Sequence, residues 1–208
     1  MNYKFVSYYD TKIYWNDELD GCGHELIEDL QNATAELVGN KPINNTLEWC
    51  SGPGYWGFSL LGSHQTKTLT LSDIHAPVKP LVEYTIAQNN FENVEFYISD
   101  NFKNIPKQQF DLIVGNPPHF IIDPYIPTYN EPRKYKDEGW KIHEDFFNNV
   151  SDYLTDDGII ILVENRFGSN PEIFRPMIEK NNLRITNHFG SVKFPLDMWY
   201  LGVDKNPA

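Results

Sequence analysis

The sequence predicts an α/β fold in which a mostly parallel sheet carries helices on both faces. Short aliphatic runs alternate with segments of helical periodicity through most of the chain, as βαβ units do. The last two strand-like runs have no helix between them, so we expect them to pair as an antiparallel hairpin through the turn "GSVKFPLD". The predicted sheet therefore has seven strands and is closed by a C-terminal hairpin.

The elements follow from local patterns taken in order along the chain. Apolar residues at helical spacing predict a first helix over 24–38, with Gly39 as its stop. A second helix begins near Tyr55 after a glycine turn, and a third covers 76–90, with Pro77 tolerated in its first turn. Further helices are expected over 139–154 and 171–181. The strands are expected over 45–51, 66–73, 93–99, 110–116, 158–165, 183–190 and 198–204.

Bulk composition limits the class of protein. Seventeen basic against twenty-nine acidic side chains give a formal charge of −12, which disfavours a nucleic acid substrate unless a local basic patch exists. The longest aliphatic run is too short to span a bilayer, and the first residues show no secretory signal. Cys22 and Cys50 are expected as free thiols in a reducing compartment. We therefore expect a cytoplasmic protein without a membrane partner, and the histidines show no metal-ligand spacing.

The junction "LEWCSGPGYWG" places glycines where a strand turns into a helix. Gly52 and Gly54 lack a Cβ, so the backbone there can approach a ligand, although a G-x-G alone is also typical of an ordinary turn. The next strand ends at Asp73, nineteen residues after Gly54, near the spacing at which an acidic side chain meets a ribose diol. Asp100 follows the strand after that. Each Asp alone is ordinarily a turn residue or helix cap, but together they indicate a nucleoside-containing cofactor.

The stretch "DLIVGNPPHF" ends the fourth strand of the predicted sheet, on the same edge. Its two prolines fix φ and remove backbone donors, which leaves a rigid loop with free carbonyl acceptors. The side-chain oxygen of Asn116 beside such a carbonyl would accept hydrogens from an NH2 group and stabilise positive charge that develops on the nitrogen. The alternative is a double-proline turn in which Asn116 bonds to its own backbone.

These motifs resemble those of the class I S-adenosylmethionine-dependent methyltransferases, with their Rossmann-like fold, in the branch whose Asn-Pro-Pro-aromatic motif acts on exocyclic or amide nitrogens. The likeness extends from Leu47 through the C-terminal hairpin and includes "LEWCSGPGYWG", "LSDIH", "SDNF" and "NPPHF" as its four motifs. The resemblance implies S-adenosyl-L-methionine as the cofactor. It implies a cofactor site made of Glu48, Cys50, Gly52, Gly54, Asp73, Ile74, Asp100, Asn101, Phe102 and Asn116.

The resemblance also implies individual roles. Gly52 and Gly54 would approach the methionine portion, Asp73 the ribose hydroxyls and Asp100 the adenine amino group. The expected catalytic residues are Asn116, Pro117, Pro118 and His119, with Phe120 packing against the substrate. We expect one methyltransferase domain over 1–208, with a lead-in and helix in 1–40 and the catalytic core in 45–208.

Within that branch the sequence is most similar in pattern to the release factor glutamine N5-methyltransferases. "DPYIPTYNEPRKYKDEGW" follows the course of their loop after the fourth motif, with Glu131, Pro132 and Arg133 in the corresponding places. The segment 120–139 is long enough for a substrate lid. By the same resemblance, segment 15–25 would fold over the methionine end of the cofactor.

The sequence departs from the family pattern in three places. Cys50 replaces the usual first glycine of the loop, and His119 stands where Tyr or Phe is usual, so stacking passes to the imidazole or to Phe120. A loop histidine is ordinarily solvated, and nitrogen methylation requires no general base, so we do not expect His119 to act as one. The residues before the glycine loop contain no counterpart of the helical domain with which release factor methyltransferases hold their substrate.

The leading acceptor is thus a glutamine side-chain amide on a protein such as a release factor. A base amine in RNA or DNA and a small-molecule amine are the alternatives. A cofactor-binding partner subunit without catalysis is the non-enzyme alternative, which the departures at Cys50 and His119 favour. The sequence leaves the oligomeric state open.

Overall fold

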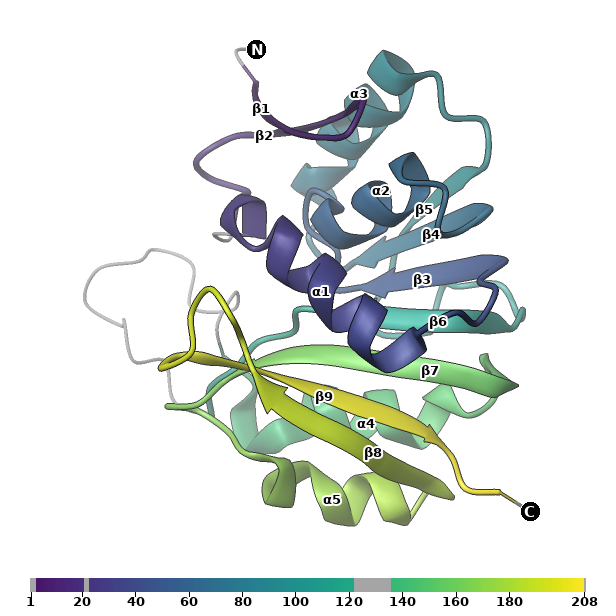
Figure 1. Cartoon of the computed structure of the whole chain (residues 1–208), viewed down its shortest axis with the longest axis vertical. Coiled ribbons are helices and arrows are strands. Elements are labelled where there is room, and N and C mark those ends of the chain that lie inside the picture. Colours follow the sequence, from purple (N-terminus) through teal and green to yellow (C-terminus); the bar gives the residue numbers. More distant parts are fainter. Residues whose placement is uncertain (1–2, 21–22, 122–135, 208) are drawn as a thin grey trace.

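The computed structural model describes residues 3–20, 23–121 and 136–207. The strands of its main sheet are β3 (Asn45–Trp49), β4 (Thr68–Asp73), β5 (Val94–Ile98), β6 (Phe110–Gly115), β7 (Leu154–Asn165), β8 (Leu183–Gly190) and β9 (Met198–Lys205). They are ordered β5-β4-β3-β6-β7-β9-β8 (Figure 1). The first five in this order are parallel, and β9 runs antiparallel to both β7 and β8. The predicted seven-stranded sheet with its closing hairpin is confirmed.

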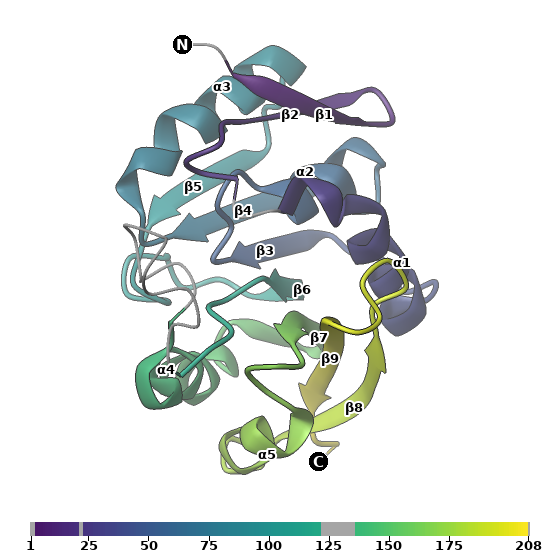
Figure 2. The same cartoon turned by 90° about the vertical axis from the view of Figure 1, so that its left-hand side faces the viewer.

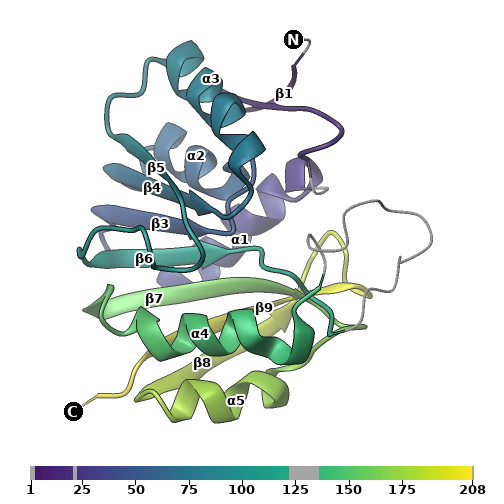
Figure 3. The ribbon, with the colours of Figure 1, turned by 180° about the vertical axis from the view of Figure 1, so that it is seen from behind.

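Helices cover both faces of this sheet, as predicted. α1 crosses one face in Figure 1, whereas α4 and α5 lie side by side across the opposite face in Figure 3. Among the described residues, no helix has both the length and the apolar character needed to cross a membrane. The helices are α1 (Ile27–Val38), α2 (Tyr55–Gly62), α3 (Lys79–Asn89), α4 (Lys141–Val150) and α5 (Pro171–Glu179).

The central strands are buried on both sides, which explains their continuous aliphatic sequences. In β6, Leu112 and Val114 belong to the core beneath α1, while Ile113 between them belongs to the core beneath α4 and α5. Successive side chains of a strand point to opposite faces, so one aliphatic run fills two cores. This arrangement brings the carboxyl ends of β3, β4, β5, β6 and β7 to a common edge.

An N-terminal hairpin was not predicted. β1 (Lys4–Tyr8) and β2 (Thr11–Trp15) pair through a two-residue loop and pack along α3 (Figure 2). The backbone N–H of Tyr14 donates to Thr85 Oγ1 at 3.1 Å, and Asn89 Nδ2 donates to the Lys12 carbonyl at 2.8 Å. The lead-in expected before the first helix is therefore a structured cap on α3.

Several predicted boundaries need correction. The helix expected over 139–154 ends at Val150, and Leu154 already belongs to β7, because its neighbour Tyr153 accepts a hydrogen bond from the Phe110 N–H at 2.7 Å. The helices expected over 24–38 and 76–90 each begin with a 3-10 turn, at Gly23–Glu25 and Ala76–Val78, before the α-helix starts. All five predicted helices are otherwise confirmed.

Strand β8 forms one edge of the sheet. Its pairing with β9 shifts register between Ile185 and Asn187, and its exposed side chains include Arg184 and His188. Arg184 Nε donates to Asp204 Oδ1 on β9 at 2.7 Å. The edge strand is therefore short of apolar exposed residues and irregular in the middle.

Candidate active site

The loop between β3 and α2 has an unusual backbone. Cys50, Gly52 and Gly54 have positive φ values of 53°, 49° and 84°. Cys50 thus adopts a left-handed conformation at the place where the resemblance predicts a glycine. Among the described residues, a Cβ built on Gly52 would have only the Leu19 carbonyl within 4 Å, at 3.9 Å, so these residues leave room beside the backbone of Gly52. A ligand can approach the chain there.

Glu48 lies beneath this loop and holds the start of α2. Its carboxylate accepts hydrogen bonds from the backbone N–H of Gly57 at 2.7 Å and of Trp56 at 3.3 Å. Burial raises the pKa of Glu48 to about 8, although the two N–H donors oppose that change. Its structural partners belong to the helix, and its expected contact with the cofactor stays a prediction.

Asp73 at the end of β4 is fixed by two backbone donors. Gly52 N–H donates to Oδ2 at 2.7 Å and His75 N–H donates to Oδ1 at 2.8 Å. Burial raises the pKa of Asp73, while these hydrogen bonds oppose the rise. The carboxylate therefore joins the glycine loop to the end of β4, and Ile74 beside it is exposed.

The third predicted motif lies on the neighbouring strand end. Ser99 N–H donates to the Asp73 carbonyl at 2.9 Å, which brings the adjacent Asp100 near Asp73. The Asn101 amide instead faces inward: it accepts from Trp49 Nε1 at 2.8 Å and donates to Asp145 at 2.6 Å. Phe102 is buried in the core. Cofactor contacts of Asn101 and Phe102 stay a prediction.

The segment before α1 lies against the glycine loop. Tyr55 Oη donates to Asp20 Oδ1 at 2.6 Å, and the Leu19 carbonyl is the atom that faces Gly52. A cavity of about 280 Å³ opens between this segment and the loop after β4, against His75, whose N–H bonds to Asp73. Its lining residues are Tyr3, Asn16, Glu18, Leu19, His75, Pro77 and Pro80. An open glycine backbone, an oriented carboxylate and an adjacent cavity fit a ligand with ribose hydroxyls.

The other half of this carboxyl edge is formed by the ends of β6 and β7. It begins with Asn116, directly after β6. Its Oδ1 atom is buried and has no hydrogen-bond partner among the described residues. A buried acceptor without a partner is costly, so this oxygen is suited to a donor that arrives with a ligand. The alternative in which Asn116 bonds to its own backbone does not apply to Oδ1.

His119 is not solvated, contrary to the usual behaviour of a loop histidine. Its side chain is only 12% exposed, and Nδ1 lies 3.4 Å from Oε2 of Glu164 at the end of β7. The other carboxylate oxygen, Oε1, lies 2.9 Å from His143 Nε2, and His143 Nδ1 lies 2.7 Å from Asp137 Oδ2. Glu164, His143 and Asp137 are all fully buried.

Sequence reasoning missed these three residues. His143 counted as one of several scattered histidines, and the carboxylates of Glu164 and Asp137 were not singled out. The available signals were a Glu at the end of the buried strand "GIIILVEN" and an Asp just before a helix, where it accepts from the N–H groups of Ile142 and His143. Only the fold brings them to His119.

The loop after β7 also packs directly on the acceptor motif. A Cβ built on Gly168 would lie 2.0 Å from the His119 carbonyl oxygen and 2.6 Å from Phe120 Cδ1. Phe120 is buried, and its carbonyl accepts from Asp137 N–H at 2.7 Å. The motif is thus held between the β7–α5 loop and the residues that precede α4.

A family model described as "Methyltransferase small domain" matches residues 4–192. The chain belongs to the methyltransferase small domain family. The family implies S-adenosylmethionine as cofactor. The glycine loop and Asp73, with the cavity against His75, would hold it.

Two curated relatives of this chain are named for different substrates. The release factor glutamine methyltransferase of Leptospira interrogans is 29% identical over 63% of this chain and 45% of its own length. The ribosomal RNA small subunit methyltransferase C of Actinobacillus pleuropneumoniae is 30% identical over 77% of this chain and 43% of its own. The chain spans less than half the length of these relatives.

Solved structures support the same fold. An S-adenosylmethionine-dependent methyltransferase from Clostridium acetobutylicum superposes with a TM-score of 0.65 at 12% identity and covers 88% of this chain and 92% of its own. At that identity the similarity concerns the fold alone. The class I methyltransferase fold predicted from the motifs is confirmed.

Some expectations fall on residues outside the described part of the chain. These are Cys22, most of the expected lid over 120–139, and its residues Glu131, Pro132 and Arg133. Cys50 is a free thiol. Within residues 3–20, 23–121 and 136–207, no cluster of three or more His, Cys, Asp or Glu side chains has an arrangement able to hold a metal ion.

Proposed function

We propose that this chain transfers a methyl group from S-adenosylmethionine to the nitrogen of a glutamine side-chain amide on a protein, such as a peptide chain release factor. The observation that carries the proposal is the buried Oδ1 of Asn116, which no described residue hydrogen-bonds, at the carboxyl edge that also carries the glycine loop and Asp73. A primary amide offers two N–H donors, and one of them would complete this acceptor. Such a substrate requires a cytoplasmic enzyme.

The chemistry asked of the protein is mainly positioning. The cofactor supplies a methyl group on a positively charged sulfur. The amide nitrogen would form the new N–C bond as the C–S bond breaks with its electron pair left on sulfur, and the nitrogen would then release a proton to solvent. Asn116 Oδ1 and the carbonyl of Pro117 would hold the NH2 hydrogens, so that the nitrogen lone pair points at the methyl carbon. The same acceptors stabilise the charge that develops on nitrogen.

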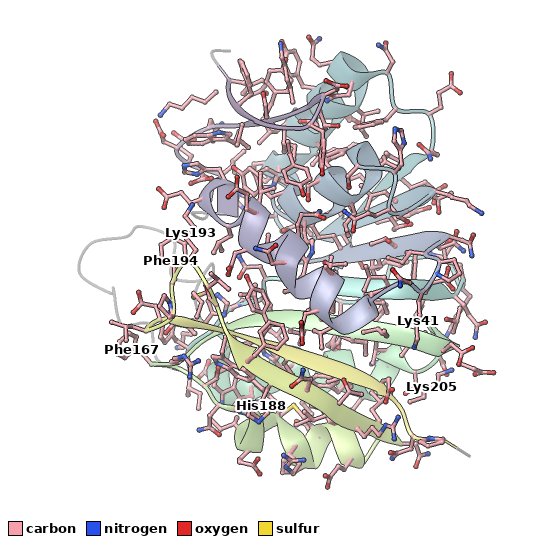
Figure 4. The ribbon with its side chains drawn as sticks, in the orientation of Figure 1. Lys41, Phe167, His188, Lys193, Phe194 and Lys205 are labelled. Atoms are coloured by element: carbon pink, nitrogen blue, oxygen red, sulfur yellow. The ribbon has the colours of Figure 1, made fainter. Side chains whose placement is uncertain are left out.

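The surface around this edge favours a protein over RNA. Phe167 in the β7–α5 loop is 78% exposed, and Val192 and Leu196 in the β8–β9 loop are 78% and 80% exposed. Figure 4 shows Phe167 on the same side of the molecule as Lys193 and Phe194 of the β8–β9 loop. Exposed apolar side chains are typical of a surface that contacts a protein, and the net charge of −12 opposes a phosphate backbone.

A base amine of ribosomal RNA is the second candidate. It is favoured by the relative that acts on small-subunit ribosomal RNA and that matches the larger share of this chain. An NH2 group on a base would satisfy Asn116 as an amide does. The two candidates therefore differ in the partner that the surrounding surface would bind, a protein or an RNA. The NH2 group would meet the acceptor motif in the same way in both.

The test uses cofactor carrying a radiolabelled methyl group with purified release factor, purified ribosomal RNA, and a cell extract separated into protein, RNA and DNA. We expect label on protein, with mass spectrometry locating the methyl group on a glutamine side chain. Label confined to RNA or DNA would overturn the substrate. Absence of both cofactor binding and transfer would overturn the enzymatic function itself.

Two variants separate the halves of the site. Asn116→Ala should lower the transfer rate by roughly 100-fold with unchanged cofactor affinity, because the acceptor alone is removed. Asp73→Asn should weaken cofactor affinity by about 10-fold, measured by calorimetry. Asn32→Ala, at an exposed position of α1, is the matched control and should change neither quantity.

A further inference from the structure

A buried chain of ionisable side chains leads from α4 to the fourth residue of the acceptor motif. Asp137 contacts His143, His143 contacts Glu164, and Glu164 contacts His119, at 2.7, 2.9 and 3.4 Å respectively. The last distance is longer than a strong hydrogen bond. Ser169 Oγ donates to the same Glu164 oxygen at 3.2 Å and helps to orient it. This series of hydrogen-bonded side chains therefore connects the loop after β6, the end of β7 and the start of α4.

The charges of this chain determine which protons it carries. Burial disfavours a charged imidazole, but the carboxylates of Glu164 and Asp137 outweigh it and raise the pKa of His143 to about 9. Burial likewise disfavours a charged Glu164, but the charge of His143 and hydrogen bonds from both histidines lower the pKa of Glu164. At neutral pH, Glu164 is therefore a carboxylate that can only accept hydrogen bonds.

Aromatic rings hold His143 in place. Its imidazole stacks on Phe174 at 4.6 Å and meets Trp49 and Trp140 edge to face at 5.7 and 5.4 Å. The faces of aromatic rings attract cations, which suits a protonated imidazole. Asp137 is fixed in turn, because its carboxylate accepts from the first turn of α4 and its N–H donates to the Phe120 carbonyl. The series of side chains thus contacts residue 119 through Glu164 and residue 120 through Asp137.

A carboxylate that accepts from one ring nitrogen of a histidine determines what the other nitrogen can do. With Nδ1 donating to Glu164, a neutral His119 carries its proton on Nδ1, and Nε2 keeps a lone pair. Among the described residues, Nε2 has no hydrogen-bond partner. Nε2 is then an acceptor, as Asn116 Oδ1 is. The two hydrogens of one NH2 group match this pair of acceptors, with Nε2 taking the hydrogen otherwise assigned to the Pro117 carbonyl.

We propose that Asp137, His143 and Glu164 are positioning residues that keep the His119 imidazole in its Nδ1–H form, so that Nε2 accepts a hydrogen bond from the NH2-bearing acceptor. This rests on the proposed function, and it assigns the histidine at the fourth place of the motif to recognition of the acceptor. The chain would select primary amides or amines over nitrogens that carry a single hydrogen.

The first experiment reads the proton directly and needs no methyl transfer. Nitrogen NMR of protein with ¹⁵N-labelled histidine distinguishes protonated from unprotonated ring nitrogens, and His119→Phe identifies the His119 signals by their loss. We expect Nδ1–H with unprotonated Nε2 for His119 and two protonated nitrogens for His143 at neutral pH. A proton on Nε2 of neutral His119 would overturn the proposal, whether or not the chain proves to be a methyltransferase.

The second experiment measures coupling between Glu164 and His119 in transfer. His119→Phe keeps an aromatic ring without nitrogens and should lower kcat/KM by roughly 10-fold, as expected for one hydrogen bond. Glu164→Gln should give a similar loss with unchanged cofactor affinity. The double variant should be no worse than His119→Phe alone, because Glu164 acts through His119. His188→Phe, on an exposed position of β8 (Figure 4), is the matched control and should retain full activity.

Additive losses in the double variant would overturn the proposal, since a merely structural Glu164 acts independently of the ring at position 119. Glu164→Gln leaves a buried imidazolium with one counter-charge and can fail to fold. In that case Asp137→Asn, which keeps an acceptor oxygen for His143, replaces it in the same cycle. If His119 shifts from the Nδ1–H form in Asp137→Asn, the result supports the proposal that the three buried residues position the imidazole. An unchanged form contradicts a role for Asp137.

Discussion

The two halves of the carboxyl edge are built in different ways. At the β3–β4 end, side chains hold backbone: Glu48 accepts from the first turn of α2, and Asp73 accepts from the N–H groups of Gly52 and His75. At the β6–β7 end, side chains hold side chains, and the partners His119 and Glu164 lie 45 residues apart. The first half depends on local conformation, whereas the second depends on three elements packing correctly.

This difference predicts how each half responds to mutation. A half that depends on backbone conformation should tolerate a change of side chain as long as the turn persists. A half that depends on buried side-chain contacts should lose its function when one neighbour moves by an ångström, even where the fold survives.

The largest expected effect comes from Gly168→Ala. Its Cβ would fall 2.0 Å from the His119 carbonyl oxygen, so the acceptor motif must shift. We expect a loss of transfer rate of about 100-fold or more, with cofactor affinity retained. Gly39→Ala is the control for adding a methyl group where there is room, because no atom of the described residues lies within 4 Å of the added Cβ. Its backbone angles, φ 60° and ψ −126°, disfavour a side chain, so this variant should lose about 1–3 kcal/mol of stability but keep its transfer rate. Equal activities of the two variants would contradict the packing argument.

An intermediate effect is expected from pH, which acts on a buried group in each half. The pKa of Glu48 is raised by burial to about 8, and that of His143 is raised by its carboxylate neighbours to about 9. Each group binds its proton more tightly in the folded chain. Its contribution is complete below the ordinary value of 4.5 or 6.5 and is lost as pH rises through about 8 or 9. The free energy of unfolding should therefore fall on going from neutral to alkaline pH.

Glu48→Gln separates the two contributions. Because Gln does not titrate, the free energy of unfolding of this variant should fall less steeply with pH than that of the unmodified chain, by at most about 1.4 kcal/mol per pH unit. The part of the fall that is due to His143 should persist. Denaturant unfolding of both proteins at several pH values gives the slopes. A variant with the same slope as the unmodified chain would show that Glu48 does not titrate in this range.

The smallest effect is expected from Cys50→Gly. Its φ of 53° is strained for a side chain, and glycine relieves that strain while losing conformational entropy and contacts. We expect a net change in stability of less than about 1 kcal/mol and unchanged cofactor affinity. Cys50→Ala keeps the strain and removes the sulfur, so it should be less stable than Cys50→Gly. The reverse order would show that the conformational entropy lost with glycine outweighs the strain that it relieves at this position.

The same contrast explains what the sequence could predict. The strands, the helices on both faces and the carboxyl-edge positions of Gly52, Asp73 and Asn116 follow from local patterns and their order. The chain from Asp137 to His119 could not be predicted, because its members are local features of ordinary kind until the sheet brings β6 and β7 side by side.

One further miss has a local cause, and one prediction that stays open falls on side chains that turn into the core. The hairpin of β1 and β2 turns at Tyr9 and Asp10, with φ of 49° at Tyr9, rather than at the Asn-Gly or Asp-Gly pair that ordinarily marks such a loop. Asn101 and Phe102 belong to a motif whose order suggested a ligand site, yet their side chains complete the core around Trp49 and Tyr153. Order along the chain does not tell which way a side chain turns.

The irregular edge strand β8 has a consequence for how the protein behaves at high concentration. An edge with regular, apolar strand geometry is a template on which another sheet can grow. The register shift between Ile185 and Asn187 and the charged Arg184 oppose that growth, because an incoming strand would meet a kinked ladder and a guanidinium already bonded to Asp204. The sheet is thereby protected from continuing into a neighbouring molecule and from fibrous aggregation along this side.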